Sequence, residues 1–199
     1  MTELVVKPLS PALAGDFLRF FDHERGPAFA DNPEWAKCYC HYYQVPPAID
    51  WPSLSAPQNR TAMQARIEVG EMEGFLAYDA AEPVGWLNAQ PRHKLRHCFD
   101  RMRVPPPALP CAPYQAAVIV CFVIAPAWRR RGVARTLLAA ALSSLAARGL
   151  VLVDAFPFKS ADSENAADHY HGALPMFTAA GFAPVAETET ITVVRKFLR

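Results

Sequence analysis

The sequence of 199 residues lacks the features that mark several large classes of protein. It has no apolar run of the roughly 18–20 residues that a membrane-spanning helix needs. Residues 1–9 lack the charged-then-apolar pattern of a secretory signal. The net charge of +1 provides no general field that would attract nucleic acid or a membrane surface. These absences lead us to expect a cytoplasmic protein with neither nucleic acid nor a membrane as partner.

A disulfide framework and an internal repeat are missing as well. The cysteines are odd in number and loosely spaced, which favours reduced thiols at Cys38, Cys40, Cys98, Cys111 and Cys121. The composition is globular, with 52% hydrophobic and 20% charged residues, and the length is typical of a single domain over residues 1–199. The 19 prolines cluster among aromatic residues, which indicates long ordered loops.

Hydrophobic periodicity and turn residues predict strands and helices that alternate along the chain. Strands are expected over residues 4–9, 74–78, 84–88, 116–124, 150–156 and 191–198. Helices are expected over residues 11–24, 59–71, 133–148 and 172–180. Two long irregular inserts lie between these elements, over residues 26–55 and 91–114. Loops of this length in a compact domain are usually functional.

The most informative stretch is a strand, a basic turn and a helix over residues 118–147. The apolar, β-branched run that ends at Ile124 is typical of a strand buried on both faces. The turn Arg129-Arg130-Arg131-Gly132 follows and leads into the helix. The first N–H groups of a helix have no internal partner and lie at its positive end, while glycine permits close approach of a ligand. The stretch therefore predicts an anion site, although its single glycine fits neither a Walker loop nor a dinucleotide fingerprint.

This stretch resembles the coenzyme A (CoA) site of the GNAT superfamily of N-acetyltransferases. Arg129-x-x-Gly132-x-Ala134 is similar to the family's pyrophosphate motif, and Phe122-Val123-Ile124-x-Pro126 is similar to its fourth strand. Residues 75–91 resemble the second and third strands, and residues 176–182 resemble the last helix with its Gly-Phe ending. The resemblance covers residues 56–199 well and the first 55 poorly. Three segments resemble one bacterial subgroup without an assigned substrate: Gln58-Asn59-Arg60, Cys121-Phe122-Val123 and residues 171–177.

The resemblance implies an α/β fold: a mixed, mostly antiparallel central sheet with helices on both faces. It also implies that acetyl-CoA is the acyl donor and that the fourth strand parts from its neighbour to pair with the pantetheine arm. No metal is expected, because the cysteines and histidines are poorly spaced for a zinc site. The CoA-binding residues that the resemblance implies are Phe122, Val123, Ile124, Arg129, Arg130, Arg131, Gly132, Val133, Ala134 and Arg135.

The implied reaction is direct attack of an amine on the thioester, for which the fourth strand supplies a backbone N–H donor at Phe122 or Val123. The family's usual proton donor is a tyrosine at the position of Phe177, which has no proton to give. Tyr170, two turns earlier, is the candidate acid for the departing thiolate, and His169 and His171 flank it. Two alternatives stay open: Tyr170 is a packing residue, or the thiolate leaves without a dedicated acid.

The family's general base is often a glutamate on the fourth strand, where this chain has Val118. Asp154 is the candidate base, because a carboxylate inside an apolar strand must be paired or functional. A structural, hydrogen-bonded role for Asp154 is the alternative. Glu164 and Asp168 in the following loop are interpreted as solvated.

Both inserts contain residues for which the sequence allows more than one role. Cys38-x-Cys40-His41 is poorly spaced for structural zinc, so these residues, with Tyr39, Tyr42, Tyr43 and Trp51, are expected to line a lid over the acceptor pocket or to pack in the core. The basic run over residues 92–103 is interpreted as a solvated loop, and alternatively as a contact for the 3′-phosphate of CoA or a clamp for an acidic acceptor. Both inserts are expected to build the acceptor pocket.

The sequence thus predicts an enzyme that moves acetyl from acetyl-CoA to an amine of a small molecule or peptide. A catalytically degenerate domain that senses acyl-CoA is the alternative, since Phe177 replaces the usual acid. Nucleic-acid binding through the basic run is a third hypothesis, against which the net charge counts. Monomer and homodimer are both open.

Overall fold

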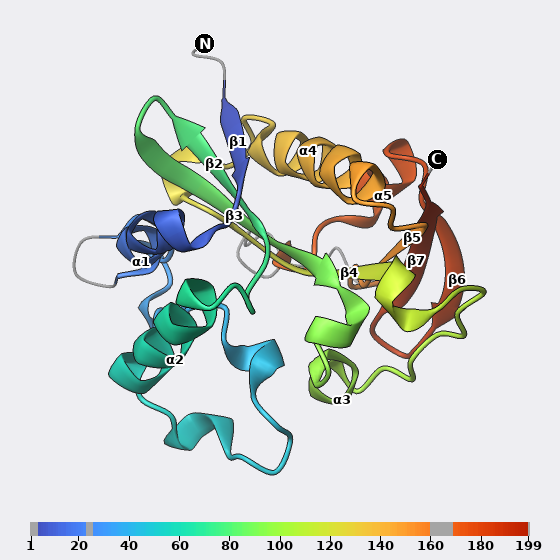
Figure 1. The fold of residues 1–199 in the computed structure, drawn as a ribbon, viewed down its shortest axis with the longest axis horizontal. Helices are drawn as coiled ribbons and strands as arrows, with labels where there is room; N and C mark the ends of the chain where they lie inside the picture. Colours follow the sequence, from blue (N-terminus) through green and yellow to red (C-terminus); the bar gives the residue numbers. More distant parts are fainter. Residues whose placement is uncertain (1–3, 23–25, 160–168, 199) are drawn as a thin grey trace.

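The computed structural model describes residues 4–22, 26–159 and 169–198. Seven strands form one open sheet in the order β1-β2-β3-β4-β5-β7-β6 (Figure 1). Only β4 and β5 run parallel among the described strands, so the expectation of a mixed, mostly antiparallel sheet is confirmed. The strands are β1 (Val5–Pro8), β2 (Phe75–Asp79), β3 (Glu82–Pro91), β4 (Ala116–Ile124), β5 (Leu152–Ala155), β6 (Ala183–Glu187) and β7 (Thr192–Phe197).

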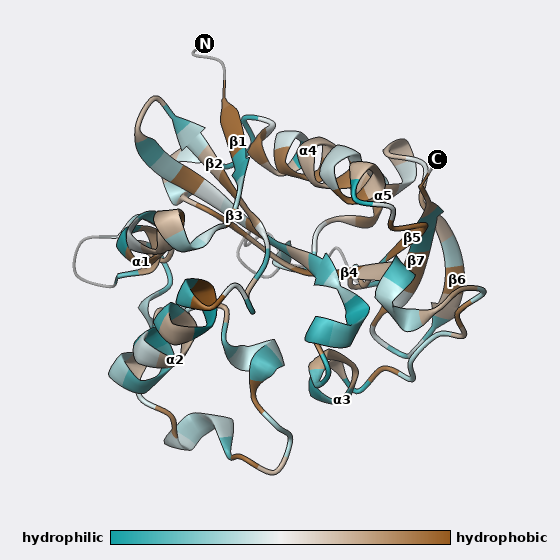
Figure 2. Cartoon of the chain, in the orientation of Figure 1, coloured by the Kyte–Doolittle hydropathy of each residue, from teal (hydrophilic) through white to brown (hydrophobic). Residues whose placement is uncertain are grey.

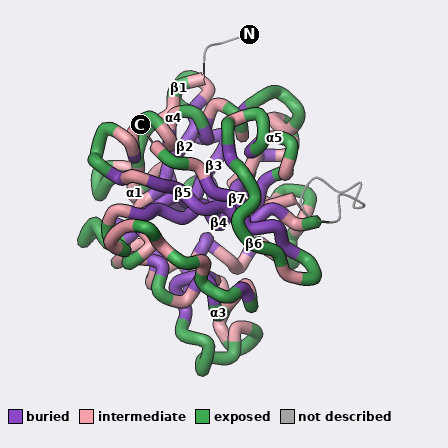
Figure 3. Tube along the Cα trace, turned by 90° about the vertical axis from the view of Figure 1, so that its right-hand side faces the viewer, coloured by how far each residue is buried: buried purple, intermediate pink, exposed green. Residues whose placement is uncertain are grey.

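Helices cover both faces of the sheet, as expected. They are α1 (Ala14–Phe21), α2 (Ala56–Glu68), α3 (Cys98–Met102), α4 (Val133–Ala147) and α5 (Leu174–Ala179). Figure 1 shows α4 and α5 on one side of the sheet and α1 and α2 on the other. Two buried clusters follow from this arrangement, one under each helix layer. Figure 2 shows hydrophobic residues running along the central strands, and Figure 3 shows these strands buried through the middle of the molecule.

Helix α4 forms as its apolar spacing predicts. Its buried residues recur at intervals of about one helical turn, so they make one stripe against the sheet: Val133, Leu137, Leu138, Ala141 and Leu145. On the opposite face, α1 buries Phe17 and Phe21 against the edge of the Trp86 indole, with ring centroids 5.0 and 6.4 Å away. None of the described helices is both long and apolar enough to cross a membrane.

Some boundaries differ from the sequence-based expectations. Helix α2 begins at Ala56 rather than at residue 59, because Ser55 and Gln58 form a reciprocal capping box ahead of it. The second insert contains the short helix α3, and β6 was not expected at all. Every residue of β6 is exposed, so the strand has no alternation of buried and exposed positions that the sequence could reveal.

The feature that positions the site is the parting of β4 from β5. The two strands pair only from Ala116 to Ile119, although β4 continues to Ile124. A bulge in the β3–β4 pairing, between Ile119 and Cys121, coincides with this point, and Val120 and Cys121 both pack into the cluster under α1 and α2. The outer half of β4 therefore has an edge that β5 does not cover, and α4 begins a few residues beyond it.

Candidate functional site

A cleft of about 920 Å³ opens beside the uncovered half of β4. Its walls come from three parts of the chain that are distant in sequence: the end of β4 with the start of α4, the segment over residues 169–176, and the first insert. The second insert contributes no residue to the cleft among those described. The expectation that both inserts build the pocket is therefore wrong for residues 91–114.

The start of α4 forms the anion-binding part of the cleft. Gly132 caps the helix with φ +87°, and Arg130 has φ +61°. The first intrahelical bond runs from the Thr136 N–H to the Gly132 carbonyl, at 3.0 Å. The N–H groups of the three residues before Thr136 therefore have no helical acceptor and point out of the helix start. A phosphate at this place would meet both these donors and the positive end of the helix dipole.

The cleft contains nearly all of the predicted CoA residues. Every one except Arg131 lies on its wall. The guanidinium of Arg131 instead packs over the Trp128 ring, 5.4 Å from its centroid. Gly132 is needed for its positive φ rather than for space, because a Cβ there would meet nothing within 4 Å.

Arg129 departs from its expected role. Its guanidinium makes a two-point ion pair with the Asp31 carboxylate and also donates to the Ile124 carbonyl at 3.1 Å. Through this ion pair, Arg129 lowers the pKa of Asp31. The side chain thus joins the first insert to the end of β4, which leaves Arg130 and Arg135 as the cations of this wall that a phosphate would meet.

The expected backbone donor on β4 is corrected by the hydrogen bonds. The Phe122 N–H donates to the Tyr170 carbonyl at 2.6 Å, and the Ala125 N–H donates to Val84, which precedes Gly85 on β3. Since N–H directions alternate along a strand, the Val123 N–H also faces β3 and the Ile124 N–H faces the open side. Of the two N–H groups on the open side, that of Phe122 is bonded to Tyr170, so we assign the donor role to Ile124 rather than to Phe122 or Val123.

Tyr170 lines the cleft, as its predicted catalytic role requires. Its ring packs edge-on against Trp35, with centroids 5.2 Å apart. Burial raises the pKa of Tyr170 to about 12, and Cys121 adds to this. The phenol is therefore protonated at neutral pH. Phe177, at the position of the family's usual acid, is fully buried against Phe122 and provides packing only.

Behind Tyr170 lies a hydrogen-bonded pair that the sequence did not reveal. The Tyr43 hydroxyl and Nε2 of His171 are 2.7 Å apart, although 128 residues separate them. Nδ1 of His171 lies 3.0 Å from the Phe156 carbonyl, which can only accept, so Nε2 accepts from Tyr43. Burial lowers the pKa of His171 to about 4, which keeps the imidazole neutral.

Asp154, the predicted base, lies away from the cleft. It is fully buried, and its two oxygens accept from Nε and Nη2 of Arg195 at 2.7 and 2.9 Å. Arg195 is on β7 directly opposite Asp154 in the sheet. The structural alternative is thus the one that this geometry supports. Glu164 and Asp168 lie outside the described residues.

The first insert supplies a further wall of the cleft. The structure brings Cys38, Cys40, Tyr42, Tyr43 and Trp51 to this wall, together with Glu34 and Trp35. Tyr39 and His41 are not part of it: the Tyr39 hydroxyl bonds Asp22, and Nδ1 of His41 bonds Asn59. Among the described residues, no three His, Cys, Asp or Glu side chains are grouped to hold a metal ion.

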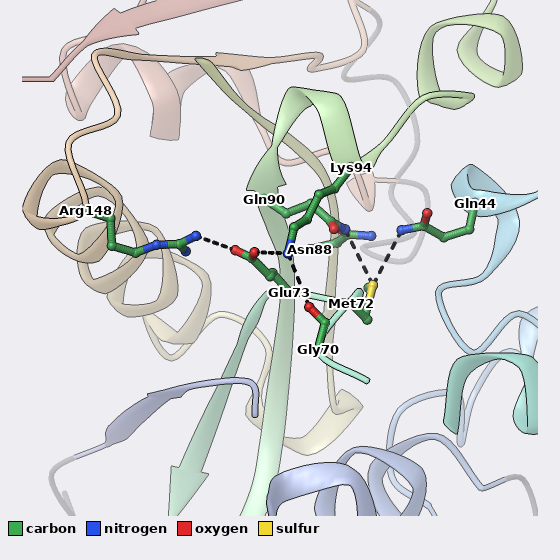
Figure 4. Close-up of polar contacts among 8 residues, drawn as sticks. All are labelled: Gln44, Gly70, Met72, Glu73, Asn88, Gln90, Lys94 and Arg148. Carbon is green, nitrogen blue, oxygen red and sulfur yellow. Dashed lines mark hydrogen bonds and ion pairs between the residues drawn. The ribbon is translucent and has the colours of Figure 1, made fainter. Parts of the chain in front are cut away.

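The basic run over residues 92–103 neither lines the cleft nor forms a simply solvated loop. Arg92 packs over the Phe99 ring at 4.5 Å, and Arg101 donates to the carbonyls of Val45, Pro46 and Ile49. Figure 4 shows Lys94 bound to Glu73 and the Gly70 carbonyl. These cations brace loops against one another, so the interpretation as a CoA contact is not supported.

Comparison with known proteins agrees with this geometry. Residues 34–174 match the model of the Acetyltransferase (GNAT) family, which is more than half of the chain. No curated protein sequence matches the chain.

Several solved structures share the fold at low sequence identity. The GNAT domain of S. lividans PAT is 16% identical with a TM-score of 0.57, covering 97% of this chain and 89% of that one. Paia N-acetyltransferase from Thermoplasma acidophilum, in complex with coenzyme A, is 10% identical with a TM-score of 0.54, covering 98% and 99%. The ribosomal-protein-S18-alanine N-acetyltransferase from Escherichia coli is 12% identical with a TM-score of 0.51, covering 98% and 94%.

Proposed function

The chain belongs to the GNAT acetyltransferase family, and on that premise we propose that it transfers the acetyl group of acetyl-CoA directly to an amine of a small molecule or peptide. The observation that carries the proposal is the single cleft in which the N-terminus of α4, the uncovered half of β4 and Tyr170 meet. We further propose that residues 1–199 form one such domain, because both buried clusters pack on the same sheet.

The CoA pyrophosphate would bind the free N–H groups at the start of α4, with Arg130 and Arg135 beside it. The pantetheine arm would run along the open side of β4, where the Ile124 N–H is available to the thioester oxygen. This path leads the sulfur from the helix start toward Tyr170. Paia N-acetyltransferase, which has this fold, was solved with coenzyme A, which supports a CoA ligand here.

The acceptor amine would enter from the first insert and attack the thioester carbon. Glu34 is the one carboxylate among the described residues on the cleft wall, so we propose that it receives the amine's proton. Tyr170 would donate its phenolic proton to the departing thiolate. Glu34 replaces Asp154 in this scheme, since both oxygens of Asp154 are bound by Arg195.

Two glycines at opposite ends of α4 provide a matched test of CoA binding. Gly132 and Gly149 have φ +87° and +81°, and a Cβ would meet nothing within 4 Å at either position. Gly132→Trp would place an indole over the proposed phosphate site, whereas Gly149→Trp imposes a similar backbone strain at the far end. Calorimetry should detect CoA binding in the native chain and Gly149→Trp, but none in Gly132→Trp. Equal affinity in the two variants would refute the proposed site.

A catalytically degenerate acyl-CoA sensor is the second candidate function, favoured by Phe177 in place of the usual acid. Release of CoA thiol across a broad panel of amines separates the two functions. Sustained release with any acceptor rules out the sensor, whereas tight CoA binding with no release on the whole panel favours it. A cytoplasmic location, the lack of nucleic-acid and membrane partners, and the choice between monomer and homodimer stay predictions.

A further inference from the structure

Three thiols meet on the wall of the cleft, and the proposed transfer reaction uses none of them. Cys38, Cys40 and Cys121 all line the cleft, and no disulfide links them. Cys40 is the most unusual of the three, because its backbone has φ +55° directly after Tyr39 with φ +45°. Two consecutive left-handed residues without glycine indicate that the surrounding structure holds this sulfur in a fixed place.

A line of buried amides ends at the Cys40 sulfur. Nδ2 of Asn88 donates to Sγ at 3.2 Å. Oδ1 of Asn88 accepts from Nε2 of Gln90 at 2.7 Å, which fixes the amide so that its N–H groups face the sulfur. Figure 4 shows the continuation of this line, in which Gln90 and Gln44 both direct Nε2 at Sδ of Met72. Buried amides need partners, and here the last partner is a thiol in the cleft.

Two further polar side chains lie close to the same sulfur. Nε1 of Trp86 is fully buried without a well-aligned hydrogen-bond partner, and it lies close enough to Cys40 to stabilise the ionised thiol. Cys121 lies in the same buried cluster as Cys40 and stands opposite Asn88, the donor to Cys40, in the β3–β4 ladder. Burial works against ionisation of Cys40, but its polar neighbours Cys121, Trp86 and Asn88 together lower its pKa, whereas the pKa of Cys121 is raised. Donors converging on one sulfur favour the thiolate, the reactive form of cysteine.

We infer that Cys40 is an oxidation site for small hydroperoxides, with Cys121 as its resolving thiol. In the first step the Cys40 thiolate attacks one peroxide oxygen. The O–O bond breaks, an S–O bond forms, and the leaving oxygen departs as hydroxide or alkoxide and takes up a proton. In the second step the Cys121 sulfur displaces hydroxide from the Cys40 sulfenic acid, giving a disulfide and water.

The position of the two thiols determines how their oxidation would affect the cleft. The disulfide would join the first insert to β4 one residue before Phe122, inside the cleft that the acyl arm is proposed to fill. A ligand in the cleft would in turn cover both sulfurs, so CoA should slow their oxidation. This last expectation rests on the proposed function, whereas the oxidation itself does not.

The test uses the full chain, hydrogen peroxide and peptide mapping by mass spectrometry. Cys111 is the matched control, because it is half-buried and lies outside the cleft. Cys40 and Cys121 should join in a disulfide that a dithiol reverses, at a rate at least tenfold above oxidation of Cys111. In Cys121→Ser a sulfenic acid should accumulate on Cys40, and in Cys40→Ser the thiol of Cys121 should stay reduced. Asn88→Leu should slow the reaction by roughly tenfold, the effect of about one pKa unit on the thiolate fraction.

Three outcomes would overturn the inference. One is oxidation of Cys111 ahead of Cys40, and another is unchanged oxidation of Cys121 in Cys40→Ser. The third is an unaltered Cys40 rate in Asn88→Leu when circular dichroism shows that variant to be folded. These readouts require no turnover, so absence of acetyl transfer would count against the proposed function alone. Failure of CoA to protect Cys40 in a chain that does oxidise would count against the CoA site alone.

Discussion

Asp154 offers a test that separates a structural carboxylate from a catalytic one. The side chain is fully buried, Arg195 is 8% exposed, and two hydrogen bonds of 2.7 and 2.9 Å join them. Asp154→Asn keeps the shape of the side chain but leaves the Arg195 cation buried without its counter-charge. Breaking a buried ion pair in this way costs roughly 3–5 kcal/mol. For a chain of this length that corresponds to a melting temperature lowered by roughly 6–20 °C.

The assay combines urea denaturation with CoA release measured per folded molecule. We expect Asp154→Asn to unfold at a much lower urea concentration. The rate of CoA release by its folded fraction should stay within about twofold of that of the native chain, because Asp154 lies outside the cleft. The double variant Asp154→Leu/Arg195→Met should recover most of the lost stability, because no charge is then buried alone. A stable Asp154→Asn variant that has lost its activity would refute this reasoning and restore Asp154 as the base.

Three further expectations concern the cleft. Glu34→Gln should lower the acceptor-dependent rate by about a hundredfold or more with CoA affinity unchanged, as loss of a general base does, whereas Glu71→Gln, an exposed control, should have no effect. Tyr170→Phe should lower kcat without weakening CoA binding in calorimetry, and Tyr114→Phe, the exposed control, should lower neither. His171 has a pKa of about 4 in the folded chain against an ordinary 6.5, so on acidification the unfolded chain takes up this proton first. The neutral imidazole therefore contributes about 3 kcal/mol to the free energy of unfolding above pH 6.5, and this contribution is lost as pH falls through 4. Urea titrations between pH 7 and 4 should therefore show a shallower loss of stability in His171→Gln, and an identical slope would contradict the burial of a neutral imidazole.

The part of the site that could be predicted is the part that is continuous in the chain. β4 has the predicted bounds and α4 differs by one residue, because both depend on local apolar spacing. Gly132 was recognisable because a glycine after a basic turn, at the start of a helix, permits close approach of a phosphate, although the structure needs it for its positive φ. Ser55 also carried a readable signal, since Ser-x-x-Gln is a capping box, yet the predicted start of α2 passed over it.

Apart from Tyr170, the rest of the cleft could not be predicted, since it is assembled from distant segments. No spacing rule links Tyr43 to His171 or Arg129 to Asp31, because these pairs form only when the first insert folds over the cleft. Asp154 illustrates the same limit. A buried acid must have a partner, but Arg195 became visible only through the antiparallel register of β5 and β7.

The hydrogen bond from the Phe122 N–H to the Tyr170 carbonyl limits how the proposed reaction can be arranged. It occupies one of the two N–H groups that β4 directs to its open side, so in the proposed reaction the thioester oxygen would have the Ile124 N–H as its donor. The same bond holds Tyr170 next to β4, which places the phenol on the side of the cleft that the sulfur reaches from α4. Both the α4 wall and the 169–176 segment are then taken by the acyl donor. On this proposal the amine would approach across the remaining wall, past Glu34 and Trp35, and the first insert would select the acceptor.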